Sequence, residues 1–343
     1  MWKYVLKRIG LAIVTAFIIL SLTFILMKML PFNPPIGTND ARRAGWDMLV
    51  QNGEAIRSDV PLNYLGKWDA EFSTTYGKLF YYRRPIMDQY FLWIYRCFIK
   101  WDWGVSQVVY PNVDCVIVIR EGLKVSMPIN IIATILSVPL GILLGICAAL
   151  KKNKTTDNII STSVMVFISI PSFVLITLFL ATFAYGWQIL PSMWPKPSDP
   201  IKTKVLGYII PVLCLSFGSI CGYARFTRAE LCEVMESDYL LLARTKGLTK
   251  RQAILRHALK NAMVPIVPSI LSEFIGILGG SMILESLYCI PGIGGLYLNA
   301  FNAKDYNLLF VDMALFTSIG LLAGIVLDLS YGFIDPRIRM GAR

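Results

Sequence analysis

The hydrophobic residues of this chain gather in long, nearly uninterrupted runs separated by polar segments. Six runs have membrane-spanning length: roughly Ile9–Leu30, Pro128–Leu150, Ile159–Tyr185, Val205–Tyr223, Ala262–Leu287 and Leu308–Leu329. A helix needs about 20 apolar residues to cross the hydrocarbon core of a bilayer. The pattern therefore predicts six transmembrane helices.

The first run follows Lys3, Lys7 and Arg8, so a secretory signal peptide is the competing interpretation. The run is longer than the 7–15 apolar residues of a signal peptide, and no small-x-small cleavage site follows in "KMLPFNPP". We therefore expect residues 1–30 to form a retained N-terminal anchor.

Composition supports the membrane class. Hydrophobic residues make up 55% of the chain and charged residues 16%, with a mean hydropathy of +0.58. Soluble domains have about 45–50% apolar and about 25% charged residues. The net charge of +11 does not indicate a nucleic-acid partner, because the chain lacks the RNP signature, zinc-finger spacing and basic zipper of such proteins.

Lysine and arginine are distributed unevenly between alternate polar segments. They are frequent at the N-terminus, after the second run, between the fourth and fifth runs and at the C-terminus, and rare in the two short loops opposite. By the positive-inside rule, both termini are expected in the cytoplasm. The segment from Pro31 to Met127 is too long for this rule and is expected outside.

The long outer segment is expected to be folded, since it is too aromatic for a disordered tail. Within it, Ile86–Ile99 has apolar residues at helical spacing and predicts an amphipathic helix. Cys97 and Cys115 lie in this segment, and whether they pair is left open. The chain has one histidine, His257, and no CxxC motif, so no metal site is predicted.

A basic segment between the fourth and fifth runs reads as helix, glycine, helix. Ser237 or Asp238 can cap a first helix, and Gly247 suits the left-handed position that ends it. Thr249 and Gln252 then have the T-x-x-Q spacing of a capping box. An ordinary solvated loop is the alternative, but apolar side chains exposed on such a knob usually indicate a partner.

This segment resembles the cytoplasmic coupling motif of binding-protein-dependent ABC importer permeases. Where the segment differs from the general motif, it is similar to the peptide-importer branch of the family. That branch has the pattern D-Y-x-x-x-A-R-x-K-G followed by H-x-L-x-N-A. The resemblance implies that the ATPase-coupling residues are Asp238, Tyr239, Ala243, Arg244, Lys246, Gly247, Thr249, His257, Leu259 and Asn261.

Other segments are similar to the same family in order and spacing: "RPIMDQYFLWIYRCFIKWDWGVS", "SIPSFVL", "YARFTRAEL", "GSMILESLYCIPGIGGL" and "DPRIR". Three features depart from it. Trp101 stands where glycine is usual, "LPFNPP" replaces Pro-Gly-Asp-Pro, and residues 37–78 have no counterpart. The last is interpreted as an insertion of open role.

The resemblance implies an all-α membrane protein with the six-helix type I ABC importer permease fold. The expected domains are the anchor (1–30), an extracytoplasmic loop domain (31–127) and a permease core (128–343) with the coupling loop at 224–261. The implied location is the cell membrane of a bacterium or archaeon.

The function implied is that of a permease subunit of an ATP-driven importer of di- or oligopeptides, with nickel chelates as the alternative solute. Its implied partners are a second permease subunit, two ATP-binding subunits and an extracytoplasmic substrate-binding protein. Family likeness favours a homologous second subunit over a second copy of this chain.

The chain itself is not expected to be an enzyme. Gly66-Lys67 and Gly77-Lys78 lack the following Ser/Thr and the preceding glycine of a P-loop, so ATP and Mg²⁺ are expected on partner subunits. A secondary transporter should show inverted repeats with interrupted helices, and an intramembrane enzyme should show a catalytic motif. Neither pattern is found in the sequence.

Two acids and a proline in the apolar runs, together with the Pro-Gly pair that follows the fifth run, are candidates for the translocation path or for gating: Pro171, Glu273, Glu285, Pro291 and Gly292. Intramembrane acids are costly and usually face a cavity or a partner. The alternative is a structural hydrogen bond near the outer interface, or a position closer to water than these bounds suggest. We favour this alternative for the acids, particularly for Glu285, which sits just before Pro291-Gly292.

Overall fold

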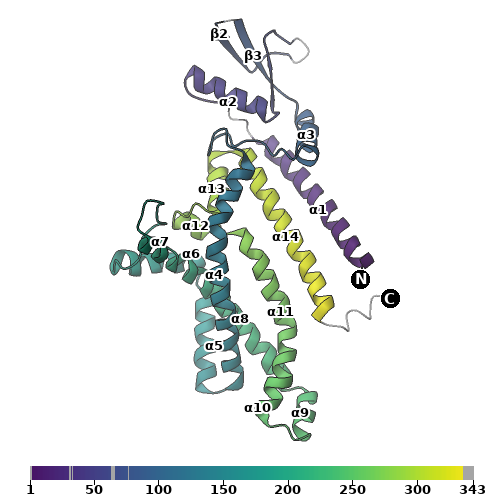
Figure 1. Ribbon diagram of the computed structural model, residues 1–343, viewed down its shortest axis with the longest axis vertical. Coiled ribbons are helices and arrows are strands. Elements are labelled where there is room, and N and C mark those ends of the chain that lie inside the picture. Colours follow the sequence, from purple (N-terminus) through teal and green to yellow (C-terminus); the bar gives the residue numbers. More distant parts are fainter. Residues whose placement is uncertain (1, 31, 33, 63–65, 76, 335–343) are drawn as a thin grey trace. The chain divides into compact units, whose positions relative to one another are not determined.

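The computed structural model describes residues 2–30, 32, 34–62, 66–75 and 77–334, and it is mostly helical (Figure 1). The motif Asp335–Arg339 lies outside these residues. The chain forms two compact units. Unit 1 contains residues 1–9, 123–295 and 319–343, and unit 2 contains residues 10–122 and 296–318.

Five helical segments of the described chain are long and apolar enough to cross a membrane, or six if one bent pair counts as a single span. They include α1 (Trp2–Met29), α4 (Cys115–Leu150), α7 and α8 (Ile201–Gly207, Ile209–Met235) and α14 (Tyr306–Ile334). The fifth segment runs through α10 (Lys250–Ala253), the π-turn η4 (Ile254–Ala258), α11 (Leu259–Gly276), the 3₁₀ turn η5 (Ile277–Gly279) and α12 (Met282–Leu287).

The bent pair is the third predicted span. Its two arms, α5 (Thr155–Ile168) and α6 (Ser172–Phe179) continuing into the π-turn η3 (Leu180–Gly186), meet at 97°. Pro171 is the N-cap residue of α6. Proline has no N–H to donate to the helix and disfavours helical geometry in the preceding residue, so the helix stops and restarts here.

Within unit 1, α4 packs closely on α8 through two glycines. A Cβ atom on Gly141 would lie 2.6 Å from Cβ of Tyr223, and one on Gly145 would lie 2.6 Å from Cβ of Thr227. Small residues four apart let helix backbones approach each other in a membrane, where packing rather than water exclusion holds helices together.

Unit 2 corrects the all-α expectation, because residues 37–83 include a small antiparallel sheet beside α2 (Asn39–Gln51). The strands β1 (Ala55–Ser58), β2 (Ala70–Thr74) and β3 (Gly77–Arg83) pair in the order β1-β3-β2. Trp46 of α2 packs with Phe72 and Tyr81 of the sheet in one buried cluster. The fold is therefore mostly helical with one sheet.

The predicted amphipathic helix is present as α3 (Ile86–Ile94), which continues into the π-turn η2 (Tyr95–Ile99). α13 (Ile293–Ala303) precedes α14. Cys97 and Cys115 are both buried and carry free thiols. Burial raises the pKa of Cys97 to about 12, so this thiol is protonated at neutral pH.

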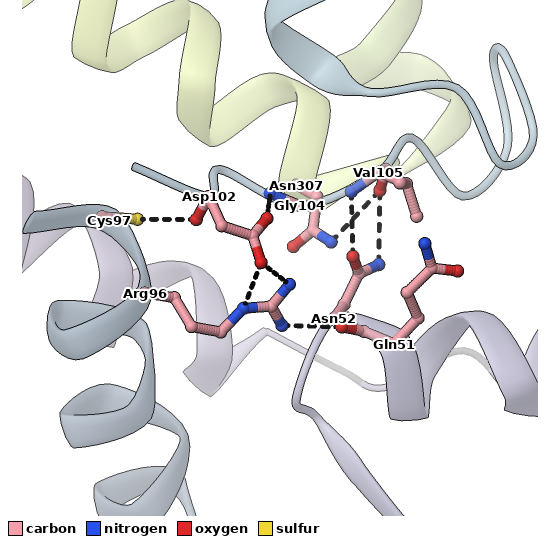
Figure 2. Close-up of polar contacts among 8 residues, drawn as sticks. All are labelled: Gln51, Asn52, Arg96, Cys97, Asp102, Gly104, Val105 and Asn307. Carbon is pink, nitrogen blue, oxygen red and sulfur yellow. Dashed lines mark hydrogen bonds and ion pairs between the residues drawn. The ribbon is translucent and has the colours of Figure 1, made fainter. Parts of the chain in front are cut away.

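Polar side chains join α2, η2 and the loop at 100–114 (Figure 2). Asn52 forms a two-way hydrogen bond with Val105: its Oδ1 accepts from the backbone N–H at 2.9 Å and its Nδ2 donates to the carbonyl at 3.2 Å. Arg96 donates to Asp102 Oδ2 at 2.9 and 2.6 Å and to the carbonyl of Gln51 at 2.7 Å. Burial opposes ionisation of Asp102, but the bonds from Arg96 and Gly104 outweigh it and lower the pKa of Asp102.

The same loop is held to the start of α14. Asn307 Nδ2 donates to the Val105 carbonyl at 3.3 Å. The fully buried Asp305 Oδ2 accepts from Ser106 Oγ at 2.6 Å and from the N–H groups of Gln107, Val108 and Val109 at 2.9–3.0 Å. Several donors on one carboxylate oxygen stabilise the charge and fix the loop.

Replacing Asp305 with Asn should loosen this loop, because an amide carries no charge and has one acceptor oxygen instead of two. We expect the free energy of local unfolding of this loop to fall by about 1–3 kcal/mol. Amide hydrogen exchange in detergent should show faster exchange at residues 106–110. The control is Asp59→Asn, an exposed loop position. Unchanged exchange in Asp305→Asn would contradict this account of the loop.

Candidate functional site

The polar segment between α8 and α11 folds into two short helices joined at Gly247; we call residues 238–261 the elbow. α9 (Asp238–Thr245) is followed by α10 and η4, which lead into α11. Within unit 1, Figure 1 shows α9 and α10 at the ends of α8 and α11, away from α6 and α7. The predicted helix–glycine–helix arrangement is confirmed.

The end of α9 is a Schellman motif. The N–H of Gly247 donates to the Arg244 carbonyl at 3.0 Å, and the N–H of Leu248 donates to the Ala243 carbonyl at 3.4 Å. Gly247 has φ +93°, a conformation that costs glycine little because it lacks Cβ. No other atom lies within 4 Å of where its Cβ would be, so backbone geometry rather than crowding calls for glycine here.

The start of α10 is the predicted capping box. Thr249 Oγ1 accepts from the Gln252 N–H at 3.3 Å, and Gln252 Oε1 accepts from the Thr249 N–H at 3.1 Å. Two N–H groups that the helix leaves without partners are thereby satisfied. Both helix ends at the turn are closed by local hydrogen bonds.

The inner face of the elbow packs on the helical body of unit 1. Leu240, Ala253, Ile254 and Ala258 are buried in one apolar cluster with residues of α4, α8 and α11, namely Ala149, Leu231, Cys232 and Ala262. Two ion pairs brace the adjoining helix ends, Lys152 with Glu236 and Arg228 with Asp157. Asp157 also accepts from Ser161 Oγ and the Asn153 N–H, which hold its carboxylate at the start of α5 in position for Arg228 of α8.

The outer face of the elbow combines exposed apolar and basic side chains. Leu241 is 61% exposed, Leu242 55% and Leu255 56%. Arg244, Lys246 and Arg251 are exposed among them. Beside this face, a hollow of about 430 Å³ is lined by residues of α8–α10 and by Lys152 and Lys154.

The predicted coupling residues fall into two groups by accessibility. Ala243 and Leu259 are half-buried, whereas the others are exposed: Asp238, Tyr239, Arg244, Lys246, Gly247, Thr249, His257 and Asn261. Ser237, rather than Asp238, is the N-cap residue of α9. Sequence reasoning missed Leu255, because its exposure depends on how η4 turns.

Glu285 belongs to a separate, buried arrangement. It accepts from Ser126 Oγ at 2.8 Å and from the N–H groups of Ser281 and Gly295 at 3.1 and 2.9 Å. A Cβ atom on Gly292 would lie 2.5 Å from Oε2 of Glu285, so glycine is required for the backbone to lie this close to the carboxylate. The structural hydrogen-bonding role favoured for Glu285 is present. Pro291 is exposed beside it.

Glu273 lies elsewhere, in a hollow of about 390 Å³ between α8 and α11. Its neighbours there are mostly polar: Ser219, Tyr223, Ser269 and Ser272, with Gly222 and Phe226. Sequence reasoning did not select these hydroxyl residues, since single serines in apolar runs give no distinct pattern. Pro171, at the bend before α6, completes the predicted set, which does not form one site.

The fold and the elbow together define a multi-pass membrane protein with a short projection that exposes apolar and basic side chains. The family described as "Binding-protein-dependent transport system inner membrane component" matches residues 141–340, which include α5–α12 and the whole elbow. The chain belongs to this family.

Relatives match the chain along its length. The dipeptide transport system permease protein DppB of Lactococcus lactis subsp. cremoris is 31% identical over 341 residues, covering 99% of this chain and 100% of that protein. The oligopeptide transport system permease protein OppB of Salmonella typhimurium is 32% identical over 340 residues, with the same coverage. A chain from an inward-facing structure of the MetNI methionine ABC transporter overlaps with a TM-score of 0.47 at 16% identity, over 66% of this chain and 98% of that chain.

Replacing Thr249 with Ala should fray the start of α10. The loss of an N-cap side chain costs about 1 kcal/mol, so tryptic cleavage after Lys250 and Arg251 should become roughly fivefold faster in detergent. Thr245→Ala is the matched control, because its hydroxyl only donates to the Leu242 carbonyl. Equal cleavage rates in the two variants would show that the capping box does not hold the elbow.

Proposed function

We propose that this chain is a permease subunit of an ATP-driven importer of di- or oligopeptides. The observation that carries the proposal is the end-to-end similarity to permeases named for dipeptide and oligopeptide transport. These names favour peptides over the nickel-chelate alternative. The elbow supplies the physical means of coupling such a permease to a motor.

In this proposal the bent pair α5–α6 counts as one span, which gives six transmembrane segments and a type I importer fold. Both termini and the elbow lie in the cytoplasm, and the segment around α2, α3 and the sheet lies outside. The basic residues of the elbow and of the loop at Lys151–Lys154 support this orientation, since positive charge is retained on the cytoplasmic side.

The elbow docks in a groove of an ATP-binding subunit. Leu241, Leu242 and Leu255 supply an exposed apolar surface, and a short helix that presents such a surface is suited to a groove. Arg244 and Arg251 orient the contact towards acidic groups, each exposed pair contributing only about 0–1 kcal/mol. Because Leu240, Ala253 and Ile254 bury the inner face, a push on the elbow is transmitted to α8 and α11.

The remaining components are a second, homologous permease subunit, two ATP-binding subunits that hold ATP and Mg²⁺, and an extracytoplasmic binding protein. This chain contributes half of the translocation pathway and no catalytic group. Glu273 lines the pathway, while the bend at Pro171 and the Glu285–Gly292 contact, next to Pro291, are where the helices pivot during transport.

Replacing Gly247 with Asp tests the coupling. A side chain would then project from the Schellman turn into the docking groove, and a negative charge would oppose the acidic groups that receive Arg244. We expect loss of the ATP-binding subunits on co-purification and loss of ATP-dependent peptide uptake in proteoliposomes, with normal amounts of this chain in the membrane.

Gly66→Asp is a matched control. Gly66 also has a positive φ, +79°, and no atom within 4 Å of its Cβ position, but it lies in unit 2 before β2. This variant should keep both its partners and its transport. If Gly247→Asp also kept its ATP-binding subunits and ATP-dependent uptake, the assignment of the elbow would be wrong.

A further inference from the structure

The hollow between α8 and α11 combines hydroxyl and carboxyl groups with apolar surface. Five of its lining residues carry a hydroxyl or a carboxyl group: Ser219, Tyr223, Ser269, Ser272 and Glu273. It is a shallow, widely open depression of about 390 Å³ rather than an enclosed pocket. It lies wholly within unit 1.

The hollow lies at the depth of the hydrocarbon core. Glu273 follows Asn261, the last residue of the elbow, by about 18 Å at a rise of about 1.5 Å per residue. With a hydrocarbon core of about 30 Å, this spacing places Glu273 near the middle of the fifth apolar run, Ala262–Leu287.

At that depth this face is unsuited to lipid. A carboxylate at the bilayer centre costs about 2.5–3.5 kcal/mol on insertion scales, so such residues face a water-filled cavity or a partner. The hydroxyl groups around Glu273 offer hydrogen bonds to a polar occupant but not to acyl chains. The face of α8 and α11 that carries the hollow is thus suited to line an aqueous path.

Two glycines of α8 lie at or near the hollow. Gly222 is one of its lining residues, and a Cβ atom built on it would meet no atom within 4 Å. The same is true of Gly218, one helical turn earlier on α8. Neither position has a neighbour that requires glycine, and a side chain at Gly222 would take up space in the hollow.

The charges of the lining residues select the sign of the occupant. Glu273 is the one charged residue among the described lining residues, which include no Lys or Arg. A single carboxylate surrounded by hydroxyl groups attracts a cation that donates several hydrogen bonds. A primary ammonium has three such donors on a compact charge.

We propose that this hollow is a transit site for the amino-terminal ammonium group of the transported peptide, bound by Glu273 with help from the surrounding hydroxyl groups. This proposal rests on the proposed importer function and adds that the permease recognises the amino terminus of the substrate. An unblocked amino terminus is recognised in the membrane path by the permease itself.

The test uses the assembled importer in proteoliposomes, with a binding protein shown beforehand to hold both trialanine and N-acetyltrialanine. Glu273→Gln keeps the size of the side chain and removes its charge. We expect it to lower ATP-dependent trialanine uptake about tenfold, as loss of one charged hydrogen bond implies, and to leave N-acetyltrialanine uptake at the wild-type rate. Glu273→Asp should restore part of the trialanine uptake.

Two further variants separate charge from shape. Gly222→Leu fills the hollow without changing its charge, and it should slow both peptides equally. Glu233→Gln removes an exposed carboxylate of α8 outside the hollow and should change neither.

An equal effect of Glu273→Gln on both peptides, or no effect on either, would overturn the ammonium site while leaving the importer function intact. Absence of ATP-dependent uptake by the wild-type assembly would instead refute the proposed function.

Discussion

The elbow depends on one constraint. The helix α9 must end and the helix α10 must begin within four residues, without leaving the N–H groups of the turn unpaired. Gly247 meets it at one end by adopting a positive φ, which lets two N–H groups return to the carbonyls of α9. Thr249 and Gln252 meet it at the other end. A turn closed in this way is short and stiff, because the N–H groups of residues 246–249 all have local partners.

Stiffness matters only because the elbow is fixed to the membrane helices. Its buried apolar face joins α4, α8 and α11, and the ion pairs Lys152–Glu236 and Asp157–Arg228 join the helix ends around it. Force applied to Leu241 or Leu242 therefore moves α8 and α11 as a unit. The same two helices carry the hollow around Glu273, so the proposed motor contact and the proposed substrate site share one rigid element.

Local chemistry made the elbow predictable from sequence. The glycine that ends α9 and the T-x-x-Q box that begins α10 act over a few residues, and apolar runs located the membrane helices. The bend at Pro171 also has a local cause, although its size of 97° depends on the surrounding packing. The contacts that the sequence did not predict join residues far apart in the chain. They are the pairing of β1 and β2 with β3, the hydrogen bonds from Ser106–Val109 to Asp305, and the hydrogen bond from Ser126 to Glu285. The residues next to each of these partners in the sequence do not indicate which distant residue it will contact.

The claim that the elbow is the contact with an ATP-binding subunit is tested most directly by photo-crosslinking. A photoreactive amino acid is placed at Leu241, and another at Ile36 as an exposed position in unit 2. In membranes that contain the whole importer, irradiation should join position 241 to an ATP-binding subunit and should not do so from position 36. If position 241 formed crosslinks only to lipid or to another membrane subunit, the elbow would not be the coupling contact.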